Sequence, residues 1–236
     1  STLPFYAYLK VADGCDNCCT YCVIPSLRGA FRSRPMEELA AEAEGLAARG
    51  VKELILVAQD TTRYGEDLYG RLALPELLER LAKIEGVEWL RILYAYPDRV
   101  TDALIETMAR EDKVVKYLDI PIQHVNERIL RAMRRRGTKA ELSALFTKLR
   151  ERIPGVTLRT TVITGFPGET DAEFTELAEF LAGARFERFG AFAYSREEGT
   201  PAARMPDQVD EDVKLRRQEI LMERQGVITE EQNREK

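Results

Sequence analysis

The sequence predicts an α/β protein folded as a partial (β/α)6 barrel, and a doubly wound open sheet is the alternative. Six runs rich in aliphatic and aromatic residues alternate with segments of helical pattern, at residues 5–11, 51–57, 89–94, 114–122, 156–163 and 186–194. Runs that are apolar on both faces and separated by helices indicate parallel strands joined by right-handed crossovers. Six such units are too few to close an eight-stranded barrel, so the predicted barrel is partial.

The predicted helices begin and end at ordinary start and stop signals. They cover residues 35–49, 75–84, 101–109, 126–135, 139–152 and 170–181. A proline lies in the first turn of each of the first two helices, and a glycine follows the end of each. Thr101 and Asn126 are of the residue types that cap helix N-termini, and Thr170 or Asp171 caps the last of these helices.

The composition predicts a soluble globular protein in the cytoplasm. Of the 236 residues, 44% are hydrophobic and 32% are charged, and the formal net charge is −5. The sequence has no apolar stretch long enough to span a bilayer and no charged-then-apolar leader, so we expect no membrane association. The acidic balance argues against a nucleic-acid footprint over the whole domain, although local basic runs are present.

We expect one core domain followed by a charged segment. Residues 1–204 carry the strand–helix units, and residues 205–236 are highly charged and helix-prone. The chain starts without Met and stops without a helix cap, so we interpret it as the central piece of a longer, monomeric protein. Residues 205–236 would then form a charged helix or linker.

All four cysteines lie in one short stretch, residues 15–22, which we call the cysteine segment. Four thiols so close together suit a metal site in a reducing compartment better than a disulfide framework. The spacing is C-x3-C-x2-C if Cys19 is the middle ligand and C-x2-C-x3-C if Cys18 is. Four thiolates could hold one zinc ion or a four-iron cluster, whereas three would leave one iron of a cluster open to a substrate or cofactor.

Polar residues and glycines gather where the other predicted strands end. They are Gln59 and Asp60 after the second strand, Gln123 and His124 after the fourth, residues 165–169 after the fifth, and Tyr194 and Ser195 after the sixth. Functional residues of parallel α/β folds lie at the carboxyl ends of the strands. We therefore expect these residues and the cysteine segment to form one active site.

The first spacing, with Tyr21 directly before the last cysteine, resembles the signature of the radical S-adenosylmethionine (SAM) superfamily. The resemblance implies that Cys15, Cys19 and Cys22 hold a [4Fe-4S] cluster whose open iron chelates the amino and carboxylate groups of SAM. An electron from the cluster then cleaves SAM to methionine and a 5′-deoxyadenosyl radical. Tyr21 is expected near the adenine. Cys18 is expected to be a small residue without a ligand role, or else a redox or sulfur-carrying group.

The superfamily places residues that hold the methionine amino group of SAM after the second strand. The resemblance thus implies cofactor contacts for Gln59, Asp60 and Thr61, which could alternatively cap a short turn. Gly165 permits close approach of the backbone to the cofactor. The superfamily's looser G-x-I-x-G-x-x-E pattern is matched only in part here, because its first glycine is replaced and Glu169 lies one place late. A role for Glu169 itself is not implied.

Gln123 can both donate and accept hydrogen bonds, so it is the candidate for lining the catalytic pocket. Tyr194 is a further candidate for cofactor contact, from the end of the last strand. His124 could shuttle protons, but a lone histidine at a strand end is more often a hydrogen-bonded structural group. The three arginines at 134–136 could contact phosphate, although basic residues also suit the C-terminus of a helix.

Further motifs spread over nearly the whole chain resemble the methylthiotransferases of this superfamily, at residues 19–29, 32–35, 119–124, 133–137 and 164–170. Within that group, residues 58–62 and 190–201 look like the RimO type. Its substrate is an aspartate of small-subunit ribosomal protein twelve, modified at the β-carbon. The sister type, MiaB-like, acts on a tRNA adenosine.

The resemblance implies insertion of sulfur into an unactivated C–H bond, with a second SAM supplying the methyl group. It also implies a second [4Fe-4S] cluster on an N-terminal domain outside this chain, and an electron donor of the flavodoxin or ferredoxin type. Three functions follow as candidates. The first is a protein-directed methylthiotransferase core, the second a tRNA-directed one, and the third a non-catalytic zinc or electron-transfer module.

Overall fold

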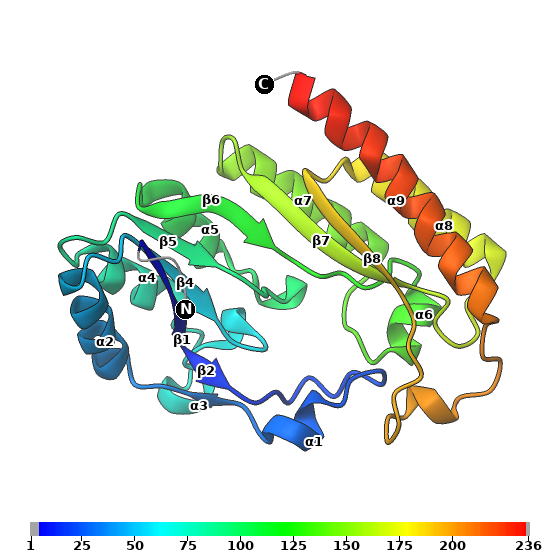
Figure 1. Ribbon diagram of the computed structural model, residues 1–236, viewed down its shortest axis with the longest axis horizontal. Helices are drawn as coiled ribbons and strands as arrows, with labels where there is room; N and C mark the ends of the chain where they lie inside the picture. The colour runs from blue at the N-terminus through cyan, green and yellow to red at the C-terminus, as the bar shows by residue number, and fades with distance from the viewer. Residues whose placement is uncertain (1–4, 235–236) are drawn as a thin grey trace. The chain divides into compact units, whose positions relative to one another are not determined.

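Six strands form the main sheet of the computed structural model, which describes residues 5–234 (Figure 1). Their order is β1-β4-β5-β6-β7-β8, the same as their order along the chain. Their bounds are Tyr6–Lys10 (β1), Glu53–Val57 (β4), Trp89–Ile92 (β5), Val114–Asp119 (β6), Thr157–Thr164 (β7) and Arg188–Ala193 (β8). The α/β class is confirmed, and each strand lies within its predicted run or is displaced from it by one residue.

Helices connect the strands, and a second, two-stranded sheet is made by β2 (Ala12–Asp13) and β3 (Arg32–Ser33). The α-helices are α1 (Ile24–Arg28), α2 (Met36–Ala48), α3 (Glu66–Tyr69), α4 (Leu74–Ala82), α5 (Asp102–Arg110), α6 (Glu127–Ala132), α7 (Lys139–Arg152), α8 (Asp171–Ala184) and α9 (Glu211–Arg234). The short 3-10 helices are η1 (Thr61–Arg63), η2 (Pro97–Arg99) and η3 (Ala202–Arg204). The predicted N-caps Thr101, Asn126 and Thr170 all accept hydrogen bonds from first-turn amides.

Contacts within the chain divide the described residues into two units. Unit 1 comprises residues 5–16, 24–119 and 148–156, and unit 2 comprises residues 17–23, 120–147 and 157–234. Unit 1 holds β1, β4, β5 and β6, whereas unit 2 holds β7 and β8. The cysteine segment is shared, because Cys15 belongs to unit 1 and the other three cysteines belong to unit 2.

In unit 1 the four strands pair in parallel and bury one face. Leu54 and Leu56, two residues apart on β4, share a face and are both fully buried. Helix α4 buries Leu74, Leu77, Leu78 and Leu81, the i, i+3, i+4, i+7 spacing of one helical stripe. Hydrophobic periodicity therefore positions the helices of this unit against the strands.

The opposite face of the unit 1 strands is not an apolar core. Tyr8 of β1 and Trp89 of β5 are 53% and 49% exposed. Arg91 of β5 donates to the Glu53 carboxylate of β4 at 2.6 Å. The expectation that these strands are apolar on both faces was therefore wrong for β1 and β5. Buried and more exposed residues alternate along these two strands. One face of each strand therefore packs in the core, and the opposite face is open to other contacts.

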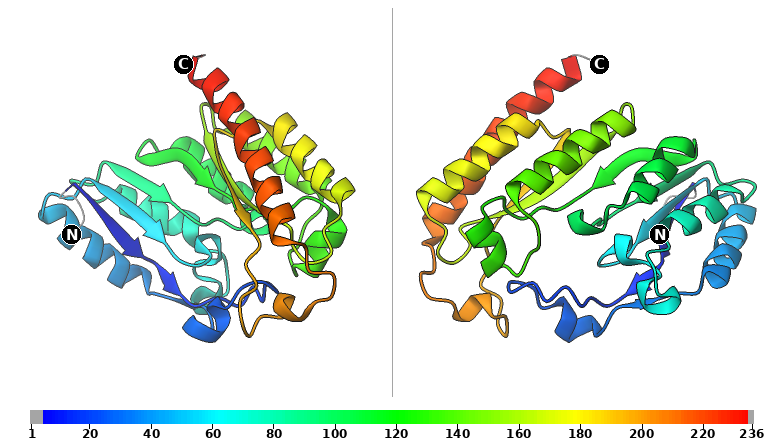
Figure 2. Two further views of the ribbon diagram at one scale, coloured as in Figure 1. Left: turned by 45° about the vertical axis from the view of Figure 1, so that its right-hand side comes forward. Right: turned by 180° about the vertical axis from the view of Figure 1, so that it is seen from behind.

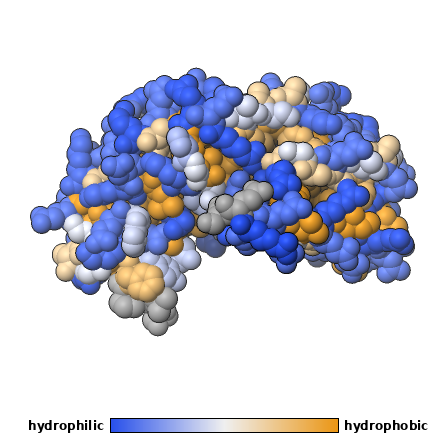
Figure 3. Space-filling view, turned by 90° about the horizontal axis from the view of Figure 1, so that it is seen from above, coloured by the Kyte–Doolittle hydropathy of each residue, from blue (hydrophilic) through white to orange (hydrophobic). Residues whose placement is uncertain are grey.

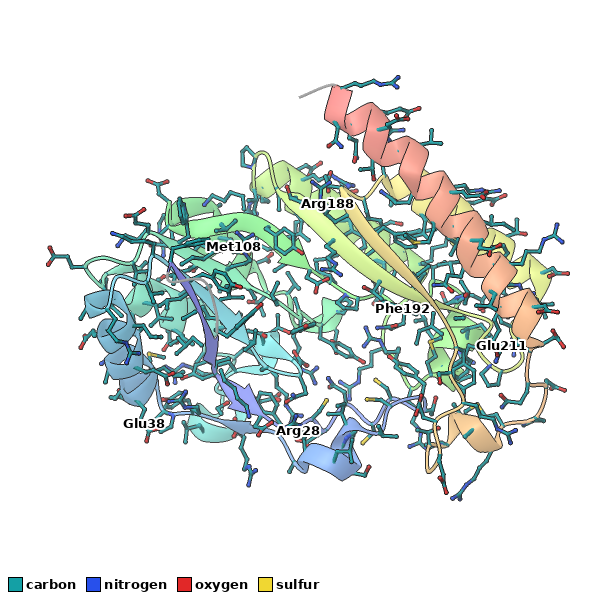
Figure 4. The ribbon with its side chains drawn as sticks, in the orientation of Figure 1. Arg28, Glu38, Met108, Arg188, Phe192 and Glu211 are labelled. Atoms are coloured by element: carbon teal, nitrogen blue, oxygen red, sulfur yellow. The ribbon has the colours of Figure 1, made fainter. Side chains whose placement is uncertain are left out.

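In unit 2, β7 and β8 pair in parallel, and α9 packs against both strands and α8. Both views of Figure 2 show α9 running alongside α8. Glu211, labelled in Figure 4, begins α9 and accepts a hydrogen bond from the Lys214 ammonium. The side of α9 facing the unit buries Lys214, Arg217, Leu221, Gln225 and Ile228. Contacts thus group residues 211–234 with β7 and β8 in unit 2. The predicted domain boundary at residue 204 stays a prediction.

Three glutamines of α9, spaced seven residues apart, donate to backbone carbonyls in and before β8. Gln218 Nε2 donates to the Ala191 oxygen, Gln225 Nε2 to the Phe186 oxygen and Gln232 Nε2 to the Arg185 oxygen, each at 2.8 Å. Because β8 ends the strand order, its outer side has no neighbouring strand to supply these donors. The amide side chains of the helix supply them instead.

The face of the molecule in the view of Figure 3 is mostly hydrophilic, with smaller hydrophobic patches between the hydrophilic residues. This agrees with a charged content of 32%. Within residues 5–234, no helix has the length and apolar character needed to cross a membrane.

The glutamine contacts predict a measurable loss of stability. Gln225→Leu leaves the buried Phe186 carbonyl without its donor, which costs about 1–3 kcal/mol. The free energy of unfolding from urea denaturation should fall by that amount. Glu223→Leu, on the exposed side of the same helix, should change it by less than about 0.5 kcal/mol. Equal losses of unfolding free energy in the two variants would show that the hydrogen bond from Gln225 to the Phe186 carbonyl does not stabilise the fold.

Candidate active site

The cysteine segment starts from a short antiparallel base in unit 1, where Ala12 and Asp13 of β2 pair with Ser33 and Arg32 of β3. Beyond this base, the Cys15 amide donates to the Gly29 carbonyl at 3.1 Å. The Phe31 amide donates to Asp16 Oδ1 at 3.2 Å. The backbone around Cys15 is therefore hydrogen-bonded to residues 29–31, which directly precede β3.

Gly14, directly before Cys15, occupies a position that only glycine fits. Its φ is +79°, in the left-handed region that other residues avoid. A Cβ at this position would lie 2.1 Å from the Ala30 carbonyl oxygen, closer than any real contact. The close approach of the two backbone stretches at Cys15 thus depends on the missing side chain.

Arg63 of η1 connects the turn after β4 with the cysteine segment, and sequence reasoning did not identify it. Its Nη1 donates to Asp16 Oδ2 at 2.9 Å and its Nε donates to Glu66 Oε2 at 2.6 Å. Its guanidinium carbon lies 5.2 Å from the centre of the Phe31 ring. No local pattern marks this contact, because Arg63 and Asp16 are 47 positions apart.

In unit 2, Thr20 anchors the remainder of the cysteine segment. Its amide donates to the Met133 carbonyl at 3.1 Å, and its Oγ1 donates to the Ala132 carbonyl at 2.9 Å. Its own carbonyl accepts from the Ala202 amide at 2.9 Å. Since Thr20 is 2% exposed, these bonds are shielded from water. Thr20 therefore fixes the segment between the end of α6 and η3.

Tyr21 packs against a buried cluster of unit 2 formed by Ile129, Met133, Phe166, Tyr194 and Ala202. Two of the predicted site residues, Tyr21 and Tyr194, are thereby brought to one hydrophobic cluster. The Phe166 and Tyr194 rings meet edge-on, with centroids 5.6 Å apart. Tyr194 is 3% exposed and burial raises the pKa of its hydroxyl.

All four cysteines are thiols. Cys15, Cys19 and Cys22 are half-buried, whereas Cys18 is exposed and has a left-handed φ of +53°. Among residues 5–234, no three His, Cys, Asp or Glu side chains are grouped closely enough to hold a metal ion. The donor chemistry nevertheless fits an iron–sulfur cluster, because the half-buried thiols are the three of the C-x3-C-x2-C spacing.

After β4, the side chains of Asp60 and Thr61 form hydrogen bonds that stabilise the turn in which they lie. Asp60 is 1% exposed and accepts from Thr62 Oγ1 at 2.7 Å and from Arg99 Nη1 at 2.9 Å. The Thr61 hydroxyl donates to the Leu93 carbonyl. Gln59 differs, since its buried Oε1 accepts no hydrogen bond from any described residue. Of the three predicted cofactor contacts, Gln59 is the one with an unsatisfied polar atom.

Gln123 lies beyond β6 in unit 2 and bridges to β7. It has a φ of +70°, and its backbone exchanges hydrogen bonds with Thr161 and Ile163, each at 2.9 Å. Its neighbour His124 is fully buried, and His124 Nδ1 accepts from the Asn126 amide at 3.0 Å. His124 is thus held at Nδ1 by its own turn, while its buried Nε2 has no hydrogen-bond partner among the described residues.

The loop after β7 rests on a buried ion pair between Glu169 and Arg217 of α9. Both Glu169 carboxylate oxygens accept from the Gly165 amide at 3.1 Å. Arg217 Nη1 donates to Glu169 Oε1 at 2.7 Å, and His124 Nε2 lies 3.5 Å from Glu169 Oε2. A Cβ on Gly165 would lie 2.2 Å from Lys214 Cγ, so the close approach that this glycine allows here is that of α9.

Comparison with known proteins identifies the family. Residues 9–181 match the model of the Radical SAM superfamily. The chain belongs to this superfamily. The cysteine spacing in the sequence had predicted this membership, and the match confirms it.

Two curated relatives of this radical SAM chain have the same name. The chain is 56% identical over 232 residues to "Ribosomal protein uS12 methylthiotransferase RimO" of Geotalea uraniireducens, covering 98% of this chain and 52% of the relative. The protein of the same name from Pelotomaculum thermopropionicum is 58% identical over 233 residues, with 99% and 52% covered. The chain thus spans about half the length of the curated relatives it matches.

Solved structures of other radical SAM enzymes share the fold. The methyltransferase TsrM from Kitasatospora setae, with cobalamin and a [4Fe-4S] cluster bound, aligns with a TM-score of 0.70 at 17% identity, covering 84% of this chain and 38% of TsrM. Coproporphyrinogen III oxidase (HemN) from Escherichia coli aligns with a TM-score of 0.66 at 19% identity, covering 97% and 54%. The predicted fold class is confirmed by these likenesses.

Gly14→Ala is expected to destabilise the chain more than Gly29→Ala. Both glycines have left-handed φ values, so each substitution adds about 1–2 kcal/mol of backbone strain. Only Gly14 also meets a backbone carbonyl, whereas nothing lies within 4 Å of a Cβ at Gly29. Urea denaturation should show the larger loss for Gly14→Ala, with faster labelling of Cys15 by a thiol reagent. Matching losses and labelling rates would contradict the close approach.

Arg217→Met is expected to lower the free energy of unfolding by about 3–5 kcal/mol, because it leaves the buried Glu169 carboxylate without its cation. The double variant Arg217→Met with Glu169→Gln should recover part of that loss. Arg216→Met, at the exposed neighbouring position, is the control and should change the free energy little. A double variant no more stable than Arg217→Met alone would argue against the ion pair as the cause.

Proposed function

We propose that this chain is the radical SAM core of a methylthiotransferase that modifies ribosomal protein uS12. The observation that carries the proposal is 56% identity over 98% of the chain to a relative of that name. The substrate group is the β-carbon of an aspartate, into whose C–H bond a methylthio group is inserted. The chain works within a longer protein, as a monomer in the cytoplasm, and takes electrons from a carrier of the flavodoxin or ferredoxin type.

Cys15, Cys19 and Cys22 are the proposed ligands of a [4Fe-4S] cluster with one iron open to SAM. Their half-burial supports this assignment, since thiolate ligands of a cluster are shielded from solvent. Once bound, the cluster and SAM would supply the radical chemistry needed to remove hydrogen from the substrate carbon. Cys18 is not needed as a ligand. Cys18 is exposed whereas the other three cysteines are half-buried, and this contrast supports the ligand role of those three.

The remaining site residues orient SAM and the substrate. Gln59 Oε1, buried without a donor, is proposed to accept from the SAM amino group, while Asp60 and Thr61 hold the turn that presents it. Tyr21 is proposed to contact the adenine. Tyr194 is proposed to line the cofactor site, and Gly165 to do so only through its backbone, since Lys214 of α9 fills the space beside its Cα. Gln123 is proposed to line the substrate pocket.

The ligand assignment is tested by metal analysis. After anaerobic reconstitution the chain should hold about 4 irons, and Ala at Cys15, Cys19 or Cys22 should abolish this binding. Cys18→Ala should retain the iron and serves as the matched control. Stoichiometric zinc in place of iron would favour the non-catalytic metal module, and loss of iron with Cys18→Ala but not Cys19→Ala would overturn the ligand set.

The reaction is tested in two stages. The reconstituted chain should form 5′-deoxyadenosine from SAM when dithionite is added, but should not complete methylthiolation alone. The full-length protein should then methylthiolate ribosomal subunits and not tRNA. Product on tRNA alone would replace the proposed substrate with a nucleic acid.

A further inference from the structure

The end of α6 is attached to the cysteine segment within unit 2. The carbonyls of Ala132 and Met133 belong to the last turn of the helix, where no helical amide is available to them. Thr20 of the cysteine segment supplies both donors. The turn that follows α6 is therefore held directly against the segment that contains Cys19 and Cys22.

The same turn displays three exposed guanidiniums, those of Arg131, Arg134 and Arg136, which we call the arginine turn. Within residues 5–234, none of the three has a carboxylate at ion-pair distance. Arg128, one turn earlier, is by contrast engaged by Glu173 through two nitrogens. The arginine turn is thus a local excess of positive charge on a chain whose net charge is −5.

Arg134 occupies a backbone position that favours glycine. Its φ is +54°, and the helix closes around it with hydrogen bonds from the Arg134 amide to Arg131 and from the Arg135 amide to Leu130. This is the Schellman pattern, in which the left-handed residue is usually glycine. The helix dipole favours a cation in the last turn, which accounts for Arg131. It does not account for a large side chain at a strained left-handed position.

We propose that the arginine turn is the docking surface for an acidic one-electron donor protein that reduces the cluster. The inference rests on the proposed function, since it requires a cluster at the cysteine segment. Redox partners form small, transient interfaces that charge complementarity steers. The backbone of the turn that carries these guanidiniums is hydrogen-bonded to Thr20 of the cysteine segment, so a carrier bound to them would lie next to its acceptor. A site that only binds phosphate would not need hydrogen bonds between its turn and the cysteine segment.

The test compares two reductants on the reconstituted chain. Formation of 5′-deoxyadenosine is measured with reduced flavodoxin and, separately, with dithionite, which needs no docking surface. Arg131→Glu with Arg136→Glu should slow the flavodoxin-driven rate by about tenfold at low ionic strength and remove most of its salt dependence. The dithionite-driven rate should not change. Arg216→Glu with Arg224→Glu, an equal charge change on the exposed side of α9, should leave both rates as they are.

Arg134→Gly separates docking from folding. Glycine relieves the left-handed strain, so the Tm should stay the same or rise, while the flavodoxin-driven rate falls. A falling rate with an undiminished Tm cannot come from a damaged fold.

Three results would overturn the inference. An unchanged flavodoxin rate in the double variant would remove the docking role, and an equal fall with both reductants would place the effect on the cluster site instead. Weaker binding of an RNA oligonucleotide with an unchanged flavodoxin rate would make the arginine turn a phosphate site. Absence of 5′-deoxyadenosine from the unmodified chain with dithionite would instead contradict the proposed function, and the inference with it.

Discussion

The cysteine segment has no regular structure of its own, so its backbone must be held by hydrogen bonds from elsewhere in the chain. On one side, Cys15 and Asp16 are tied to residues 29–31. On the other side, Thr20 is tied to the end of α6 and to η3. Two other features of the site serve this attachment. Gly14 permits the close approach on the first side, and the buried aromatic cluster under Tyr21 supports the second.

The helix–strand order could be predicted because it depends on local signals. Apolar periodicity, caps such as Thr101 and terminal prolines act within a few residues of where they occur. The superfamily could also be predicted, because its cysteine signature is contained in eight consecutive residues. Contacts between residues far apart in the sequence could not be predicted. Thr20 and Ala132 are 112 positions apart, and neither lies in a sequence pattern that predicts their contact.

Helix α9 shows why a charged sequence is a poor guide to burial. Lys214 and Arg217 are 6% exposed, although both would be assigned to a solvated face by composition. The aliphatic stem of Lys214 fills the space that Gly165 leaves, and its ammonium lies 5.4 Å from the Tyr194 ring centre. Arg217 is buried because Glu169 is buried with it. A charge is tolerated inside when its partner and its hydrogen bonds are inside as well.

The glutamines of α9 have a consequence for association between chains. β8 stands at the end of the sheet, where unpaired carbonyls would offer a template for a strand from another molecule. Side-chain amides occupy those carbonyls without presenting amides and carbonyls of their own in strand geometry. The helix thus covers the β8 edge of the sheet, whereas β1 forms the other edge. Without α9, the carbonyls at β8 would be open to a strand from another molecule, and this favours self-association.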